Sequence, residues 1–326
     1  MTSPPIEEEL RGALRDDLTR ALRRLPELGT GELTFTALSG GITNRNFLVA
    51  GAPGGDRFVV RLAGTDTHLL GISREVEHAA TVTAAGIGVG PEVIAYLRPE
   101  GYLVTRFIEG RPIPEAEMRQ PERLQAMGAT LRRVHDGPAI PGLFVPFRIV
   151  EAYRALAISR ALRIPPEYEL AQAIARRIEL ACLMAPLELR PCHNDLLNAN
   201  FIDDGTRIRI VDWEYAGMGD AYFDLGNFSI NHELDADQDA ILLAAYLGLA
   251  DGVAPPAALA ARLTLMRVLS DFREAMWGVL QQGISTLDVD FIAYAADHFD
   301  RLLTAASGAP FERALVQAAD IDGGRG

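Results

Sequence analysis

Lysine is absent from all 326 residues of this chain, so arginine supplies every positively charged side chain at neutral pH. Any phosphate contact that a lysine usually makes must therefore be made by an arginine or by backbone N–H groups. Positive charge is also scarce, because 31 arginines face 44 acidic residues and leave a net charge of −13. Nucleic-acid binding requires a basic stripe, so this balance argues against it. A cationic substrate is compatible with the charge, and plain solubility explains the charge just as well.

Cysteines and long apolar runs are scarce too. With only Cys182 and Cys192, the chain has neither a disulfide framework nor a cysteine-based zinc site. The longest apolar run covers 241–250, about half of the roughly 18 residues that a membrane helix needs. The first residues are charged too early and too acidic for a signal peptide. We expect a protein of the reducing cytoplasm without a membrane span; its oligomeric state is not predicted.

Hydrophobic periodicity predicts a chain with two parts. A helix over 4–25 precedes strands at 33–39, 44–50, 57–63, 91–97 and 102–108, with a further helix at 72–86. Helices at 121–135, 149–161, 167–185, 236–249, 256–282 and 287–305 then surround one strand-rich passage at 199–213. We therefore expect an α+β chain with a small β-rich lobe over 1–108 and a larger, mainly helical lobe over 109–326.

The segment "CHNDLLNAN" (192–200) holds an acid, Asp195, among amide and turn-forming residues. A capped turn alone would explain such a stretch. The Asp204–Gly205 pair that follows predicts a hairpin, which brings Asn200 close to Asp212. A carboxylate beside an amide oxygen is a suitable site for a hard cation such as Mg²⁺. Asp195 can then orient a hydroxyl group or accept its proton.

Two quoted segments carry a family resemblance. "HNDLLNAN", followed by "VDWEYAGMGDAYFDLGN", resembles the catalytic segment of the choline/ethanolamine kinases and aminoglycoside phosphotransferases, which share the protein-kinase-like bilobal fold. The resemblance implies that Asp195 is the catalytic base and that Asn200 and Asp212 hold magnesium. It implies a structural role for Asp224 as the anchor of the catalytic loop. His193 is expected to brace the loop backbone, with direct chemistry as the alternative.

The first lobe carries the same resemblance at its glycine loop and hinge. "LSGGITNRNFLV" resembles the family's phosphate loop, in which backbone N–H groups of a tight turn face phosphate oxygens. The implied ATP-binding residues of this loop are Gly40, Gly41, Thr43 and Asn44. "VTRFIEG" resembles the hinge between the lobes, where backbone groups around Thr105 and Phe107 would bind adenine.

Arg61 occupies the position at which protein kinases place a lysine, and choline kinases also have arginine there. Its expected partner is a glutamate on the helix 72–86. The helical phase favours Glu75, whereas the spacing of the family favours Glu77. We choose Glu77 and keep Glu75 as the alternative.

Acceptor recognition is expected in the second lobe. "EAMWGVLQQ" and "DFIAYAADHF" resemble the segments that form the choline pocket, which places Trp277, Phe291 and Tyr294 near the ammonium group. Glu214 and Tyr215 are further candidates, and aromatic faces attract alkylammonium ions. Each aromatic residue could equally be helix core. The pattern also departs from the family, because Glu274 replaces a second tryptophan, and an acidic position reads Asn231 with Glu233 nearby.

Together these features predict a kinase that uses ATP and Mg²⁺ to phosphorylate the hydroxyl of an amino alcohol, choline first. Ethanolamine, an aminoglycoside or a sugar is the alternative acceptor, and a nucleotide-binding pseudokinase is the alternative of another class. ATP and GTP are not distinguished by these residues. The expected partner is a small-molecule alcohol and no nucleic acid.

Overall fold

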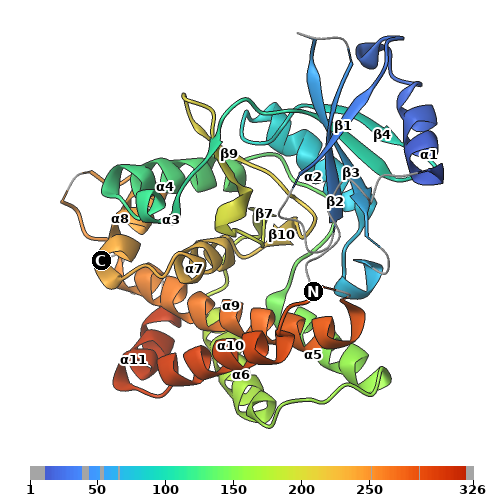
Figure 1. Cartoon of the computed structure of the whole chain (residues 1–326). Coiled ribbons are helices and arrows are strands. Elements are labelled where there is room, and N and C mark those ends of the chain that lie inside the picture. Colours follow the sequence, from blue (N-terminus) through green and yellow to red (C-terminus); the bar gives the residue numbers. More distant parts are fainter. Residues whose placement is uncertain are drawn as a thin grey trace.

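The computed structural model describes residues 12–38, 44–51, 55–64, 67–250, 252–285 and 287–320. Figure 1 shows a β-sheet with helix α1 at one end of the molecule and a group of helices at the other. This order agrees with the predicted β-rich first part and helical second part. Gly40, Gly41 and Thr43 of the expected phosphate loop lie outside the described residues.

The sheet is antiparallel and has the order β1-β2-β3-β5-β4. Its strands are β1 (Thr34–Leu38), β2 (Asn44–Ala50), β3 (Arg57–Ala63), β4 (Val93–Leu97) and β5 (Tyr102–Arg106). Side chains of a strand alternate between its two faces. In β3, Phe58, Val60 and Leu62 pack into a core with α1 (Ala13–Leu22), so Val59 and Arg61 point to the opposite face. The alternation thus directs Arg61 away from the core of this lobe.

Helix α2 (Arg74–Gly86) follows a short 3-10 helix, η3 (Thr67–Leu70), and begins where the Ser73 hydroxyl caps its first turn. Its Ala80 and Ala84 belong to the core of the helical part, whereas Glu77, one turn earlier, is buried near β3. The helix therefore connects the sheet with the second lobe. Helix α1 is followed by a 3-10 turn, η2 (Pro26–Leu28), and the part of its predicted range before residue 12 is not described.

The second part is built around α9, a helix of 28 residues whose middle, from Ala261 to Gln281, is largely buried. It packs against α5, α7, α10 and α11. The helices of this part are α3 (Glu115–Met118), α4 (Pro121–His135), α5 (Pro146–Ser159), α6 (Glu167–Met184), α7 (Ala221–Asn231), α8 (Ala236–Leu247), α9 (Ala257–Ile284), α10 (Phe291–Ala305) and α11 (Ala309–Ala318).

Short strands hold the segment between α6 and α7. They are β6 (Arg111–Pro112), β7 (Arg190–Cys192), β8 (Phe201–Asp203), β9 (Ile208–Ile210) and β10 (Gly217–Gly219), with the 3-10 turn η4 (Asn198–Asn200) before β8. The predicted hairpin is confirmed: β8 pairs with β9, and the Asp204 carboxylate accepts backbone N–H groups of Thr206 and Arg207, both at 2.9 Å. Gly205 has φ 84°, which glycine adopts without strain.

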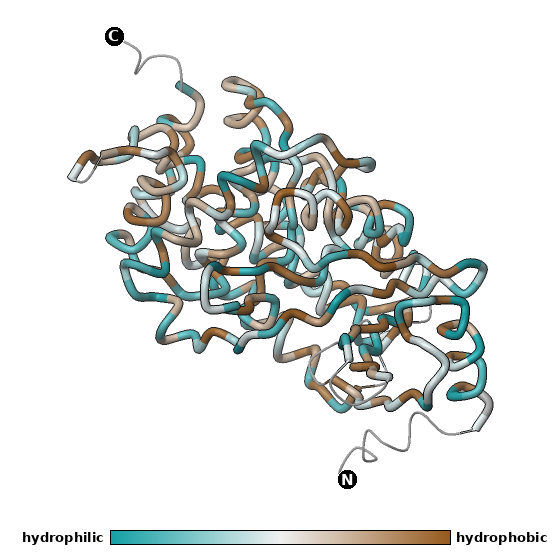
Figure 2. The backbone as a smooth tube through the Cα atoms, turned by 90° about the horizontal axis from the view of Figure 1, so that it is seen from above, coloured by the Kyte–Doolittle hydropathy of each residue, from teal (hydrophilic) through white to brown (hydrophobic). Residues whose placement is uncertain are grey.

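Hydrophobic and hydrophilic residues alternate within single helices and strands along the chain in Figure 2, as expected for elements with one buried side. Among the described residues, no helix is both long enough and apolar enough to cross a membrane.

Candidate active site

The backbone before Asp195 is held by Asp224, a fully buried residue in the first turn of α7. The two oxygens of its carboxylate accept the backbone N–H groups of His193 at 2.8 Å and of Asn194 at 2.6 Å. Asn194 has φ 68°, so this turn is strained for a residue other than glycine. The carboxylate compensates for that strain by fixing both amides, which agrees with the anchoring position expected for Asp224.

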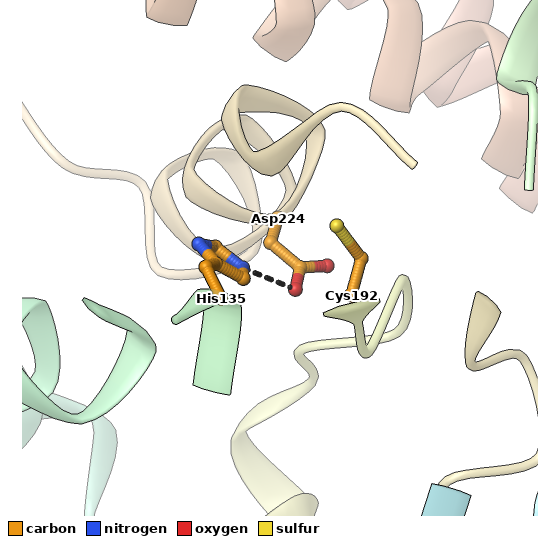
Figure 3. A group of neighbouring side chains, drawn as sticks. All are labelled: His135, Cys192 and Asp224. Carbon is orange, nitrogen blue, oxygen red and sulfur yellow. Dashed lines mark hydrogen bonds and ion pairs between the residues drawn. The ribbon is translucent and has the colours of Figure 1, made fainter. Parts of the chain in front are cut away.

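His135, Cys192 and Asp224 form a buried cluster, shown in Figure 3. Both ring nitrogens of His135, which could otherwise bind a metal ion, already form hydrogen bonds: Nε2 lies 3.0 Å from Asp224 and Nδ1 lies 3.1 Å from the Tyr246 hydroxyl. Burial raises the pKa of the Cys192 thiol well above its ordinary value, and this thiol donates to the Arg190 carbonyl at 3.3 Å. We interpret the cluster as a hydrogen-bonded support for the catalytic loop.

His193 lies under the same loop. Its Nδ1 accepts the backbone N–H of Asp195 at 3.2 Å, and its Nε2 donates to the Val211 carbonyl at 3.0 Å. Both contacts fit a neutral ring protonated at Nε2, and burial lowers the pKa of His193. The side chain thus lies between the loop and the chain after the hairpin, in the bracing position that was favoured over direct chemistry.

The hairpin brings Asn200 and Asp212 together, as the sequence predicts. Val211 N–H donates to the Asn200 carbonyl at 3.0 Å, and the Asn200 amide donates to the Asp195 carbonyl at 2.9 Å. Asp212 follows with φ 64°, and its buried Oδ1 has no hydrogen-bond partner among the described residues. Burial and the nearby Glu214 raise the pKa of Asp212 to about 6. The side-chain oxygens of Asn200 and Asp212 are the kind of ligands that a hard cation prefers.

Arg61 forms an ion pair with Glu77, and its Nη1 lies 3.7 Å from Asp212 Oδ1. Burial lowers the pKa of Arg61 to about 10, so it remains a cation at neutral pH. Glu75 instead pairs with Arg98 at the surface. Of the two glutamates considered from the sequence, Glu77 is therefore the partner, and the spacing of the family was the better guide than the helical phase.

A second ionic group joins the lobes through Arg74, a residue that sequence reasoning missed. Its guanidinium contacts Glu77 at 2.8 Å, Glu214 at 3.2 Å and the Asn44 amide oxygen at 3.0 Å. The Asn44 amide also donates to Glu214 at 2.8 Å. Asn44 and Glu214, expected at the ATP phosphates and at the acceptor, thus bind each other across the lobes in this structure.

A cleft of about 320 Å³ opens between the sheet and the hairpin. It collects the expected nucleotide and metal residues from distant parts of the chain: Arg61, Glu77, Thr105, Phe107, Asn200 and Asp212. The Phe107 N–H already donates to the Arg57 carbonyl at 2.9 Å. An adenine ring at this hinge must therefore use other backbone groups than that N–H.

Four aromatic residues from three segments meet near Glu274. The Trp277 ring lies 5.8 Å from that of Phe291 and 5.7 Å from that of Tyr294, and its indole N–H donates to the Tyr215 hydroxyl at 3.2 Å. Glu274, the residue in place of a tryptophan, accepts the Tyr294 hydroxyl at 2.9 Å. Four candidate acceptor residues, Tyr215, Trp277, Phe291 and Tyr294, are therefore neighbours. Glu233 points away to Arg119 at 3.2 Å, and the Asn231 amide nitrogen is buried without a described partner.

Arg273 is the second residue that sequence reasoning missed. Its Nη1 lies 3.4 Å from Asp195 Oδ1 and contacts Glu274, and the guanidinium carbon lies 4.4 Å above the Tyr215 ring. Its place directly before Glu274 on a helix expected at the acceptor was the available signal. Burial raises the pKa of Asp195 to about 8, and Arg273 is the nearest group that opposes this shift.

Comparison with known proteins places this geometry in a family. The family model "Phosphotransferase enzyme family" matches residues 34–260, which is more than half of the chain, so the chain belongs to that family. It is 25% identical to Protein LicA of Haemophilus influenzae over 64% of this chain and 61% of that protein, less than two thirds of its length. It is 26% identical to ethanolamine kinase 2 of Rattus norvegicus over 90% of this chain and 81% of that protein.

A solved choline/ethanolamine kinase family protein from Mesorhizobium loti has the same fold, with a TM-score of 0.80 and 28% identity over 94% of this chain and 99% of that one. The protein is thus a member of the phosphotransferase enzyme family with a kinase-like fold of a β-sheet lobe and a helical lobe.

Proposed function

We propose that this chain transfers the γ-phosphoryl group of ATP to the hydroxyl of a small amino alcohol, with choline as the first candidate. The observation that supports it most is the place of Asp195. Its carbonyl accepts the amide of Asn200, which lines the cleft with Asp212, and its carboxylate contacts Arg273, which also contacts Glu274. A single carboxylate between a nucleotide site and a cation site is the arrangement that this reaction requires.

Each residue has a defined task in the reaction. Asp195 orients the acceptor hydroxyl and accepts its proton while the oxygen attacks the γ-phosphorus in line with the leaving ADP. Arg61, kept in place by Glu77, contacts the phosphates. Asn200 and Asp212 would hold Mg²⁺, which neutralises phosphate charge when bound. Most of the rate enhancement then comes from positioning and charge stabilisation.

A cationic acceptor follows from the charges around Asp195. The carboxylates of Asp195 and Glu274 face one guanidinium, that of Arg273. All three side chains are largely buried, and buried charge is costly unless it is paired. When Asp195 is ionised, one negative charge is left for an incoming cation, and Trp277 and Tyr294 provide aromatic rings beside it.

Choline is placed before ethanolamine because a trimethylammonium group donates no hydrogen bond and needs aromatic faces, which this site gathers. Ethanolamine is the nearest alternative, since Glu274 offers an acceptor for its N–H groups. A pseudokinase without turnover is less well supported, because Asp195, Asn200 and Asp212 are all in place.

A MgATP assay against choline, ethanolamine, an aminoglycoside and a sugar tests the proposal. We expect kcat/KM to be highest for choline, with ethanolamine second and the sugar not phosphorylated. Phosphorylation of neither amine would show that the acceptor assignment is wrong, and turnover of only the aminoglycoside or the sugar would replace it.

A further inference from the structure

Arg273 is the most unusual charged residue near the candidate site. It is 1% exposed and lies on α9 between two carboxylates, with Nη1 at 3.4 Å from Asp195 and in contact with Glu274. Its guanidinium is stacked over the Tyr215 ring. The side chain therefore joins the candidate base to the carboxylate that faces the acceptor's cation.

The hydrogen bonds of Arg273 are incomplete. Its Nε and Nη2 are buried without a hydrogen-bond partner among the described residues. Arg262, a buried arginine three turns earlier on α9, is fully used by comparison: Nε and Nη2 donate to Asp220, and Nη1 donates to two backbone carbonyls. Unsatisfied buried donors reduce stability. Arg273 thus lacks the bonding that a purely structural arginine on the same helix has.

We propose that Arg273 is a positioning residue for phosphoryl transfer, holding the Asp195 carboxylate toward the acceptor hydroxyl and linking it to Glu274. This rests on the proposed function. The stacked Tyr215 ring limits the movement of the guanidinium, and Nη1 then fixes the carboxylate from one side. When Asp195 is ionised, the Arg273 guanidinium balances one of the two acidic charges and leaves the other to attract an external cation.

Steady-state kinetics of Arg273→Met with choline, or with whichever amine the wild type prefers, test this role. The methionine fills most of the space but carries no charge. We expect kcat to fall about ten- to a hundredfold, because the base loses its fixed position. The KM of the cationic acceptor should stay the same or fall, since one repelling charge is removed. Added guanidinium ion should restore part of kcat.

Two further variants separate this role from packing. Arg262→Met removes an equally buried arginine from α9, and we expect it to lower the melting temperature without a guanidinium-dependent recovery of kcat. Glu274→Gln keeps the shape of the acid but removes its charge. The Glu274→Gln variant should have a higher KM for the amine. Its KM for the uncharged isostere of choline, in which a tert-butyl group replaces the trimethylammonium group, should stay unchanged.

An unchanged kcat in Arg273→Met, or a rise in the amine KM at constant kcat, would overturn the positioning role. Loss of kcat without any response to guanidinium, matched by Arg262→Met, would mark Arg273 as packing and also overturn it. A wild-type chain that phosphorylates no alcohol would instead overturn the proposed function and, with it, this inference.

Discussion

At the scale of single residues, Asp195 and Asp212 have different neighbours, so substitution of each should change the kinetics in a different way. Asp195→Asn removes the base and the charge that orients the hydroxyl, so we expect kcat to fall by about a thousandfold with MgATP binding nearly intact. Asp212→Asn removes the unsatisfied carboxylate of the cleft and should raise the Mg²⁺ concentration needed for half-maximal rate. Turnover at magnesium concentrations from micromolar to millimolar distinguishes them. Wild-type turnover in both variants would contradict the kinase mechanism.

Glu77 and Glu75 form a matched pair of acids on α2. Glu77→Ala removes the buried partner of Arg61, so we expect a higher KM for ATP and a lower kcat, as for Arg61→Ala. Glu75→Ala breaks only an exposed pair with Arg98, and exposed pairs contribute little. Measuring the KM for ATP in the three variants checks this. Equal effects of the two glutamates would show that Arg61 does not depend on its buried partner.

Trp277 tests the aromatic side of acceptor recognition. Trp277→Ala should cost about 1–2 kcal/mol of binding to a desolvated cation, or roughly a five- to thirtyfold loss in kcat/KM for choline. The loss for ethanolamine should be smaller, because N–H groups can bind carboxylates instead. Trp277→Phe should recover part of the choline activity. Equal losses for both amines would assign Trp277 to packing.

At the scale of elements, the catalytic loop depends on a neutral histidine. The unfolded chain protonates His193 near the ordinary pKa of about 6.5, whereas burial lowers this pKa in the folded chain. The unfolded state therefore binds more protons, so the free energy of unfolding falls as pH drops below about 6.5. His193→Gln removes this titration and should flatten the dependence by up to about 1.4 kcal/mol per pH unit.

Urea unfolding at pH 7.5, 6.5 and 5.5 measures that difference. The wild type should lose more stability than His193→Gln over this range, although the variant starts from a lower value at pH 7.5. Parallel curves would mean that another group carries the pH dependence of the loop.

The strands of the sheet and helix α4 were predictable from the sequence, whereas helix α7 was not. The five strands and α4 match their predicted ranges closely. Apolar residues recur about every second position in the strands and about every 3.6 positions in the helix. Residues 221–230 of α7 are buried on every side, so no period marks the helix. The Asp195, Asn200 and Asp212 group was predictable because one hairpin brings it together. Arg74 and Arg273 were missed since the partners that link them to the site, Glu214 and Asp195, lie on other elements, far along the chain.

At the scale of the whole molecule, the two lobes meet at charged residues of the cleft. Ligand binding there should stabilise both lobes together. MgATP at one hundred times its dissociation constant should add about 2.7 kcal/mol and raise the melting temperature by several degrees. ATP with EDTA should give a smaller shift, since Asp212 then faces phosphate without a cation. Differential scanning fluorimetry checks this, and equal shifts would argue against a metal at Asp212.

The buried pair of Arg61 and Glu77 also has a consequence for chemical labelling. Acyl-phosphate derivatives of ATP mark kinases by transferring their acyl group to a lysine amine near the phosphates. The guanidinium of Arg61 stays protonated at neutral pH and is a poor nucleophile. The chain has no lysine amine to replace it. Such reagents will therefore occupy the cleft without modifying it, and a proteome survey based on them will overlook this enzyme even where it is abundant and active.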